Sequence, residues 1–261
     1  MPQFILITGG SKGIGLELAR AFASRGYSLV LSSRKQEHLD NAATTIKTDY
    51  QVEILTVPCD LSDDSGPEQL FNAVKGNSIT IHTLVNNAGV GIYGEFTKIS
   101  APAESRMMHL NINSLVTLTR LFIGDILKSR GGILNVASTA AFQPGPLMAV
   151  YYASKAFVLS FSEALHEELK EEGVKVSVLC PGPTRSEFYS AGDIDNTRLL
   201  KSGIMRMMST SAVAEAGYKG YISGQRVIIP GIMNQLGALA AKAAPRWLAA
   251  RFIHFVNQQR R

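Results

Sequence analysis

Two residues whose spacing could support proton transfer lie in the stretch Tyr151-Tyr152-Ala153-Ser154-Lys155. Tyr151 and Lys155 are four residues apart, and the sequence predicts a helix from here through Leu169, so both side chains would share one helix face. An ammonium group near a phenol favours the phenolate and lowers the phenol pKa from about 10 toward neutrality. Such a tyrosine can pass a proton to or from a substrate oxygen. The alternative is a Tyr and a solvent-exposed Lys that fall one turn apart by chance.

A glycine-rich segment near the N-terminus could bind a phosphate group. The branched apolar run Phe4–Ile7 predicts a buried parallel strand, and an amphipathic stretch from Leu16 to Arg25 predicts a helix. Between them lies Thr8-Gly9-Gly10-Ser11-Lys12-Gly13-Ile14-Gly15. Glycines let the backbone approach a pyrophosphate, and a helix N-terminus supplies oriented N–H donors. The order strand, glycine turn and helix therefore favours a dinucleotide site over a merely flexible turn.

The end of the second predicted strand, Tyr27–Ser32, indicates which dinucleotide would bind. Units that prefer NAD usually carry Asp or Glu here to hold the ribose hydroxyls, about 20 residues past the glycines. This chain has Ser33 and Arg34, and Lys12 lies in the glycine segment. A serine and two cations suit a 2′-phosphate, which a carboxylate would repel. We therefore predict NADP (NADPH) rather than NAD; the alternative is that both cations are solvated surface charges.

Strands and helices alternate along nearly the whole chain, which predicts one parallel sheet covered on both faces. The fold class is thus α/β, a doubly wound Rossmann-type sheet, with residues 1–261 as a single domain. Predicted strands follow at Val52–Val57, Thr83–Val85, Gly132–Ala137, Val174–Leu179 and Arg226–Ile229, and predicted helices at Gln36–Lys47, Gly66–Lys75 and Pro102–Lys128.

Polar residues and glycines follow several of these strands, where a doubly wound sheet forms its ligand crevice. Asp60, beside Leu61, could accept a hydrogen bond from an adenine amino group or cap the next helix. The pair Asn86-Asn87 could tie neighbouring strands together, with Ala88-Gly89 leaving room for a flat ligand. The remaining strand ends carry Ser138 and the segment Pro181-Gly182-Pro183-Thr184.

Taken together, these features resemble the short-chain dehydrogenase/reductase family along nearly the whole chain. The motifs that carry the resemblance are Thr8-Gly9-x-x-x-Gly13-x-Gly15, Asn86-Asn87-Ala88-Gly89, Asn111, Ser138, Tyr151-x-x-x-Lys155 and Pro181-Gly182. Each is modest alone, but their order and spacing make coincidence very improbable.

The resemblance implies a role for each of four catalytic residues. Tyr151 would be the general acid in carbonyl reduction, and Lys155 would lower its pKa and hold the nicotinamide-ribose hydroxyls. Ser138 would bind the substrate oxygen, and Asn111 would help to relay protons through water behind Lys155. Tyr152 and Thr139 are rivals for Tyr151 and Ser138, but the four-residue and thirteen-residue spacings favour the first choices.

The chain departs from the family pattern in two places. His82 precedes the fourth strand where many relatives have Asp, a difference of little expected consequence. Many relatives end near the last strand with an acidic-glycine turn, whereas this chain continues through Ile228-Ile229-Pro230-Gly231 for a further thirty residues. Such an ending looks like a bacterial branch of general or ketoacyl-type reductases. The resemblance also implies a homodimer or homotetramer.

The substrate pocket is expected to form from Thr139–Val150 and from a lid region, residues 185–224. These segments carry large apolar side chains that suit a lipophilic carbonyl, or that simply pack in the core and lid: Phe142, Leu147, Met148, Phe188, Tyr189, Met205, Met207 and Met208.

The C-terminal tail, residues 231–261, has three possible destinations. Trp247, Leu248, Phe252, Phe255 and Val256 lie near one helical face, and arginines contribute charge. The tail could pack on its own domain, contact another subunit, or lie on a membrane surface.

Composition limits the other possibilities. The chain has 46% hydrophobic and 18% charged residues, enough for a sizeable core, and its net charge of +5 suits anionic partners in general. No Lys/Arg run is interleaved with aromatic residues, so nucleic acid is not expected. Two cysteines, Cys59 and Cys180, end apolar runs and predict buried thiols in a reducing, cytoplasmic compartment.

Three further features of the sequence bear on metals, location and function. The five histidines show no ligand spacing, so we predict no metal. The N-terminus resembles no signal peptide, and no run approaches the length of a membrane span, although the tail leaves a membrane-peripheral location open. The function predicted is an NADPH-dependent carbonyl reductase; the alternative is a catalytically idle NADP-binding sensor or interaction protein.

Overall fold

The computed structural model describes residues 2–186, 188 and 207–258, and within them seven parallel strands form one sheet. The strand order is β3-β2-β1-β4-β5-β6-β7, so the chain reverses its direction of winding between β1 and β4. The strands are β1 (Phe4–Thr8), β2 (Ser28–Ser33), β3 (Ile54–Pro58), β4 (Ile81–Asn86), β5 (Gly132–Val136), β6 (Lys175–Leu179) and β7 (Val227–Ile228). This is the doubly wound arrangement predicted from the sequence.

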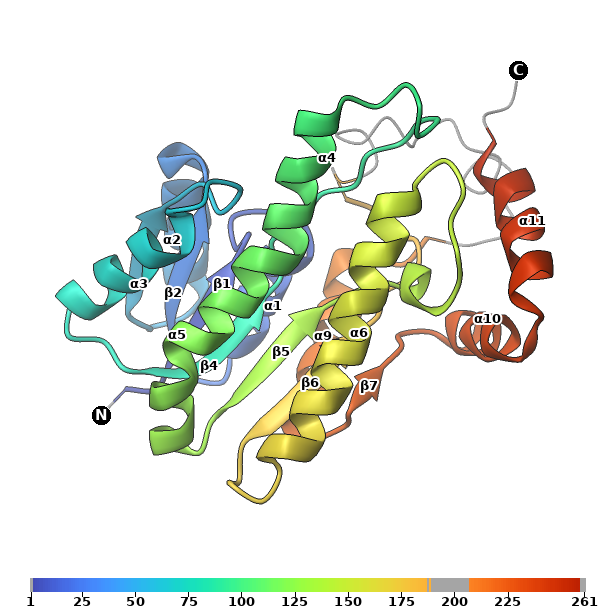
Figure 1. The fold of residues 1–261 in the computed structure, drawn as a ribbon. Helices are drawn as coiled ribbons and strands as arrows, with labels where there is room; N and C mark the ends of the chain where they lie inside the picture. The colour runs from blue at the N-terminus through green and yellow to red at the C-terminus, as the bar shows by residue number, and fades with distance from the viewer. Residues whose placement is uncertain (1, 187, 189–206, 259–261) are drawn as a thin grey trace.

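Helices cover both faces of the sheet (Figure 1). One face carries α1 (Gly13–Ala23), α2 (Gln36–Asp49) and α9 (Thr210–Ile222). The other carries α3 (Gly66–Gly76), α5 (Ser114–Ser129) and α6 (Ala149–Leu169). Two further helices, α10 (Ile232–Ala243) and α11 (Arg246–Asn257), follow the last strand.

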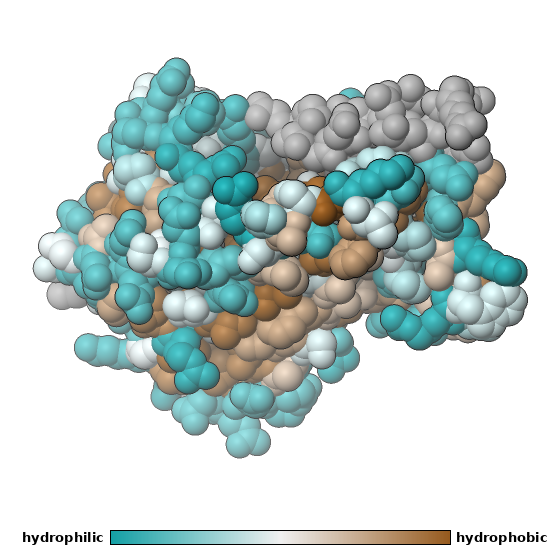
Figure 2. Space-filling model, turned by 45° about the horizontal axis from the view of Figure 1, so that its top comes forward, coloured by the Kyte–Doolittle hydropathy of each residue, from teal (hydrophilic) through white to brown (hydrophobic). Residues whose placement is uncertain are grey.

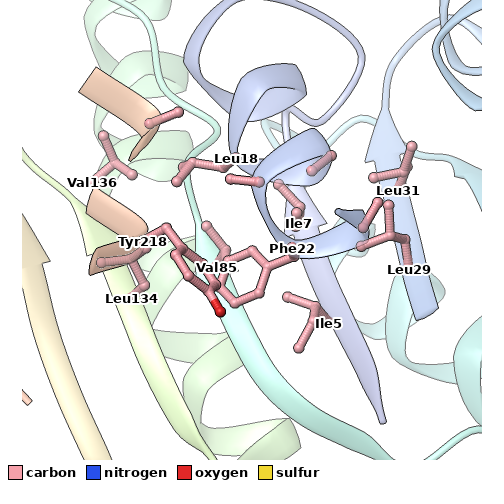
Figure 3. Packing of buried hydrophobic residues seen from close by; sticks show 14 of the residues in the cluster. Ile5, Ile7, Leu18, Phe22, Leu29, Leu31, Val85, Leu134, Val136 and Tyr218 are labelled. Carbon is pink, nitrogen blue, oxygen red and sulfur yellow. The ribbon is translucent and has the colours of Figure 1, made fainter. Parts of the chain in front are cut away.

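The alternation of side chains along a strand explains why the sheet has two hydrophobic cores. On β1, Ile5 and Ile7 join the core beneath α1 and α9, where Phe22 contacts Tyr218 edge to face at 5.1 Å between ring centroids (Figure 3). Phe4 and Leu6 of the same strand join the core beneath α3 and α5. Because both faces of β1 are buried, its sequence shows no polar alternation.

The long helix predicted over Pro102–Lys128 is interrupted by a π-helical turn. It consists of α4 (Ala101–Met108), the π-turn η1 (His109–Asn113) and α5. The whole run Ala101–Ser129 is long and apolar enough to cross a membrane by composition, contrary to our expectation that no run approaches that length. Its α5 part packs against β4 and α3, however, as the core helix of a soluble domain also would.

The prediction that residues 185–224 form a substrate lid is wrong for the second half of that region. Residues from Thr210 onward form α9, and Val213, Ala214 and Tyr221 are buried against α1 and the sheet. Apolar residues at helical spacing put this segment in the core. The first half of the region is described only at Arg185, Ser186, Phe188 and Met207–Ser209.

Candidate active site

A cleft of about 950 Å³ opens at the carboxyl ends of the strands, where the winding of the sheet reverses. It is lined by eighteen of the residues selected from the sequence as catalytic or cofactor-binding; of that set, only Gly15 and Asn111 do not line it. The residues that line the cleft come from positions as far apart in the sequence as Gly9 and Phe188, and the parallel topology brings them together.

The glycine turn at the end of β1 has backbone angles that favour glycine. Gly9 and Gly13 have φ angles of +64° and +57°, a conformation that L side chains rarely adopt. A Cβ on Gly15 would lie 2.2 Å from the carbonyl oxygen of Gly9, so only glycine fits there. The turn delivers the N-terminus of α1, with its free N–H groups, to the cleft.

The asparagine pair holds this turn against the sheet, as predicted. Asn87 Nδ2 donates to the carbonyl oxygens of Thr8, at 2.9 Å, and Gly9, at 3.2 Å. Asn86 Nδ2 donates across the sheet to Asn135 Oδ1, at 2.9 Å. The carboxyl ends of β1, β4 and β5 are thereby joined by side-chain hydrogen bonds.

Two serines at the end of β2 have hydroxyl groups that could contact a phosphorylated ribose. The hydroxyl oxygens of Ser32 and Ser33 are buried and have no hydrogen-bond partner among the described residues. Both serines line the cleft, and so do Lys12 and Arg34. Unpartnered hydroxyls beside cations fit an anionic oxygen, so the residues present fit the phosphate end of NADP.

Three basic residues at this end of the cleft were missed from the sequence. Lys35, His38 and Arg106 line the cleft together with Arg34. Arg106 comes from α4, more than 70 positions after Arg34, and no spacing rule links it to β2. Only the tertiary structure places it there.

Asp60 lies at the same end of the cleft, and its carboxylate is engaged locally. Asp60 Oδ1 accepts from the Ser62 backbone N–H, at 2.9 Å, and from the Ser62 hydroxyl, at 2.7 Å. Burial by itself raises the pKa of Asp60, but these hydrogen bonds and the charges of Arg34 and Arg106 outweigh it and lower the pKa. The carboxylate thus organises the turn before α3, while Asp60 still lines the cleft.

Tyr151 and Lys155 both line the cleft from the first turns of α6. The Lys155 ammonium lies 5.9 Å from the centroid of the Tyr151 ring and donates to the Val136 carbonyl oxygen at 3.0 Å. Burial lowers the pKa of Lys155 to about 8, because the ammonium has little water around it. A buried cation thus lies beside a tyrosine at the cleft wall.

The two rival residues lie elsewhere, which favours the choices made from spacing. Tyr152 is buried away from the cleft, and burial raises its pKa, an effect that the side chain of Asn257 on α11 partly offsets. Thr139 is absent from the cleft wall, whereas Ser138 lines it. The Ser138 hydroxyl accepts from the Ala140 backbone N–H at 3.1 Å and donates weakly to the Pro181 carbonyl oxygen at 3.4 Å.

Asn111 is buried behind the cleft in the π-turn. Its Oδ1 accepts from the Val90 N–H at 3.0 Å, and its Nδ2 donates to the Val90 carbonyl oxygen at 3.0 Å and to the Ser154 hydroxyl at 3.1 Å. A Cβ on Gly89 would lie 3.2 Å from Asn111 Oδ1 and 3.3 Å from Lys155 Nζ, so both side chains flank that glycine. Asn111 therefore connects the loop after β4 with α6.

The apolar part of the cleft agrees only in part with the expected substrate pocket. Phe188 lines it and packs against Tyr151 at 5.5 Å between ring centroids, and Ile92, Met107 and Leu110 line it as well. Phe142 instead packs in the core beneath α6, and Met148 is buried against Tyr151 and Tyr152. Tyr189 and Met205 lie outside the described residues.

Metal binding and cysteine chemistry add little to this site. The described residues contain no group of three His, Cys, Asp or Glu side chains that could hold a metal ion, and the expectation of a metal-free protein stays a prediction. Cys59 and Cys180 are free and buried, as the sequence predicted.

Comparison with known proteins agrees with this geometry. The family model of the short chain dehydrogenases matches residues 3–195. The very-long-chain 3-oxoacyl-CoA reductase of Rattus norvegicus is 31% identical over 268 residues, covering 100% of this chain and 81% of the rat protein.

Two solved structures are similar over most of their length. A short-chain dehydrogenase from Sphingobium yanoikuyae in complex with NADPH has a TM-score of 0.81 and 29% identity, with 92% of each chain covered. The bulky-bulky ketone specific alcohol dehydrogenase from Comamonas testosteroni has a TM-score of 0.76 and 27% identity, covering 94% of this chain and 96% of that one. The family match, these relatives and the fold together show that this chain belongs to the short-chain dehydrogenase/reductase family of oxidoreductases.

Proposed function

We propose that the protein is an NADP-dependent oxidoreductase that interconverts a lipophilic ketone or aldehyde and its alcohol. The observation that carries the proposal is the buried Lys155 ammonium beside Tyr151, with Ser138 on the same cleft wall. These groups supply a cation, a proton donor and a second hydroxyl around one space, which is what polarising a carbonyl group requires.

The glycine turn and the basic end of the cleft would hold the dinucleotide. The backbone of Gly9–Gly15 and the N-terminus of α1 would bind the pyrophosphate, and Ser33, Arg34 and Lys12 the 2′-phosphate. Asp60, Leu61 and the segment Asn87–Gly89 would flank the adenosine, and Pro181, Gly182 and Thr184 the nicotinamide end. When bound, the nicotinamide supplies the hydride.

The protein's own part in the reduction is to move a proton and stabilise charge. As negative charge develops on the substrate oxygen, the Tyr151 hydroxyl donates its proton to it and the Ser138 hydroxyl donates a hydrogen bond. The Lys155 ammonium stabilises the phenolate that remains, and a low-polarity surrounding strengthens this attraction. Asn111 keeps α6 and the loop after β4 in register, and we propose that it also helps the phenolate to regain its proton through water.

The apolar cleft wall and the relatives' names support a lipophilic substrate. Ile92, Met107, Leu110 and Phe188 would contact its hydrocarbon part. The rat relative is named for a very-long-chain acyl substrate and the Comamonas structure for bulky ketones. We propose a carbonyl flanked by large apolar groups on this basis.

Replacing each tyrosine of the pair separately tests the assignment. We expect Tyr151→Phe to lower NADPH-dependent reduction of bulky or long-chain ketones by at least about a thousandfold while NADPH binding, measured by fluorescence titration, stays within a few fold. Tyr152→Phe is the matched control and should keep most of the activity. Turnover that survives in Tyr151→Phe but not in Tyr152→Phe would overturn the assignment, and wild-type NADPH binding with no turnover of any ketone would favour the idle sensor.

The expected homodimer or homotetramer and the cytoplasmic location remain predictions. Figure 2 shows a continuous hydrophobic area over the front of the molecule, on the side where α5 and α6 lie in Figure 1. Phe157 on that side is 39% exposed and stacks on Phe161 at 5.8 Å between ring centroids. We propose this surface as the subunit contact.

A further inference from the structure

The two C-terminal helices carry most of the exposed large hydrophobic side chains of the described residues. Met233 and Ile232 on α10 are 75% and 74% exposed, and Trp247 and Phe252 on α11 are 63% exposed. Leu236, Leu239, Leu248 and Phe255 complete this set, which we name the C-terminal apolar surface. A protein seldom leaves so many large apolar side chains together in water without a partner for them.

The spacing of the buried residues on α10 and α11 shows that one side of each helix packs on the domain and that the C-terminal apolar surface is the opposite side. On α11, Ala249, Ile253 and Asn257 are buried, four residues apart each time, and on α10 Asn234 and Ala238 are buried. Ile253 packs in a cluster with Met107, Tyr151 and Tyr152. The tail therefore packs on its own domain, one of the three predicted alternatives, and still presents an apolar face on the opposite side.

Charge identifies the kind of partner. After Glu215 the chain contains no Asp or Glu and seven Lys or Arg residues. Lys242 lies on α10 and Arg246 and Arg251 lie on α11, and no ion pair links them to a carboxylate in the described part of the chain. Arg251 extends over the Trp247 ring, with its guanidinium carbon 5.7 Å from the ring centroid. The apolar side chains are thus accompanied by cations only.

We propose that the C-terminal apolar surface docks this protein on an anionic phospholipid bilayer. Trp, Phe and Leu on one face with Arg and Lys at its border match an amphipathic helix that lies in the plane of the lipid headgroups. Each helix has 12 residues, far short of the roughly 20 needed to span a bilayer, so the helices lie on the membrane and do not cross it. A second copy of this chain fits poorly, because a two-fold contact would bring equal cations together.

The position of α11 gives this docking a consequence for the cleft. Ile253 contacts the cluster that contains Tyr151, so the lipid surface would lie about one helix diameter, roughly 10 Å, from the catalytic helix. An apolar substrate dissolved in the bilayer would then be held close to the cleft. The docking itself does not depend on which reaction the protein catalyses.

The single tryptophan of the chain makes the test direct. Full-length protein is mixed with vesicles of phosphatidylcholine, alone or with phosphatidylglycerol, and Trp247 fluorescence and co-sedimentation are measured. We expect a blue shift of the emission, quenching by brominated phosphatidylcholine, and co-sedimentation with the anionic vesicles. Binding should weaken at high salt because salt screens the arginines.

Two variants and one control make the result specific. Leu248→Ser/Phe252→Ser and Arg246→Glu/Arg251→Glu should each weaken binding to anionic vesicles at least tenfold without changing the thermal unfolding temperature appreciably. Phe96→Ser, which removes an exposed aromatic side chain outside the C-terminal apolar surface, should bind as the wild type does. Absence of a blue shift and of co-sedimentation with anionic vesicles, or unchanged binding by both double variants, would overturn the proposal. A blue shift that follows protein concentration without lipid would also overturn it, because a second copy would then cover the surface.

Discussion

Lys155 illustrates how a catalytic residue can oppose the stability of its own fold. Its ammonium is buried at the cleft wall, and burial lowers its pKa from 10.5 to about 8. Below about pH 8 the folded and unfolded chains both carry the proton, so the full cost of burying the charge is present. Between about pH 8 and 10.5 only the unfolded chain holds it, and the free energy of unfolding therefore rises with pH.

We expect Lys155→Met to raise the free energy of unfolding at pH 7 while it abolishes activity. The gain is at most about 3 kcal/mol, since one pKa unit corresponds to about 1.4 kcal/mol and the variant loses the hydrogen bond to Val136. Denaturant unfolding of both proteins should show the gain shrinking as pH rises through this window. A difference that stays constant from pH 7 to 10.5 would show that the charge of Lys155 is not its origin.

Ser33 provides the corresponding prediction for the cofactor. Its unpartnered, buried hydroxyl beside Arg34 leaves room for an anionic oxygen. Ser33→Asp should raise the KM for NADPH at least about tenfold and improve the use of NADH, because a carboxylate repels a 2′-phosphate. Ser33→Ala is the control without charge, and its KM for NADPH should change only a few fold. Equal effects of both substitutions would remove Ser33 from the phosphate site.

The C-terminal helix α11 is hydrogen-bonded to the loops beside the active site. Asn257 Nδ2 donates to the Pro146 carbonyl oxygen at 3.0 Å, and the Tyr93 hydroxyl donates to the Asn257 carbonyl oxygen at 2.9 Å. The side chain of Asn257 also acts on the Tyr152 hydroxyl, whose pKa it lowers against the effect of burial. One buried residue of α11 thus contacts the loop after β4, the loop before α6, and α6 itself.

Asn257→Ala should therefore act on both stability and turnover. Losing a buried amide with these partners should lower the free energy of unfolding by about 1–3 kcal/mol, and ketone reduction should fall with it because Tyr152 adjoins Tyr151. Thermal melting and NADPH oxidation measure the two effects. Gln258→Ala, at the adjacent position, is the control expected to change neither. An unaltered melting temperature in Asn257→Ala would mean that α11 is held by its apolar contacts alone.

The helix between β4 and β5 contains a π-turn that its sequence did not predict. Its apolar periodicity predicted one continuous α-helix, and the structure inserts the π-turn His109–Asn113. The bidentate bond of Asn111 to Val90 lies in that turn, where the helix meets the loop of the cleft. Such turns frequently occur at functional sites, and no local pattern signals them.

In the whole molecule, the catalytic cleft and the C-terminal apolar surface both lie close to α11. The sheet topology gathers the cleft residues at its carboxyl edge, and α10 and α11 extend the domain beyond the last strand (Figure 1). The inner face of α11 packs near the catalytic helix, while its outer face carries apolar and cationic side chains. If the bilayer proposal holds, the reaction should therefore be faster for a vesicle-embedded ketone than for the same ketone when docking is blocked.

The sequence alone was enough to predict the fold class and eighteen of the residues that line the cleft. Local patterns carry this information, since a glycine turn requires positive φ angles at Gly9 and Gly13 and a Tyr-Lys pair requires only helical spacing. The strand boundaries predicted from the sequence differ from the observed ones by a few residues, because the ends of a strand depend on its pairing with neighbouring strands.

The tertiary structure decided what depends on contacts between distant residues. It placed Arg106 beside Arg34, put residues from Thr210 onward into the core rather than a lid, and buried the tail on one face only. It also separated Tyr151 from Tyr152 by exposing the first to the cleft and burying the second against Asn257. Each outcome depends on which surfaces meet, and hydrophobic burial along one chain segment does not reveal its partner.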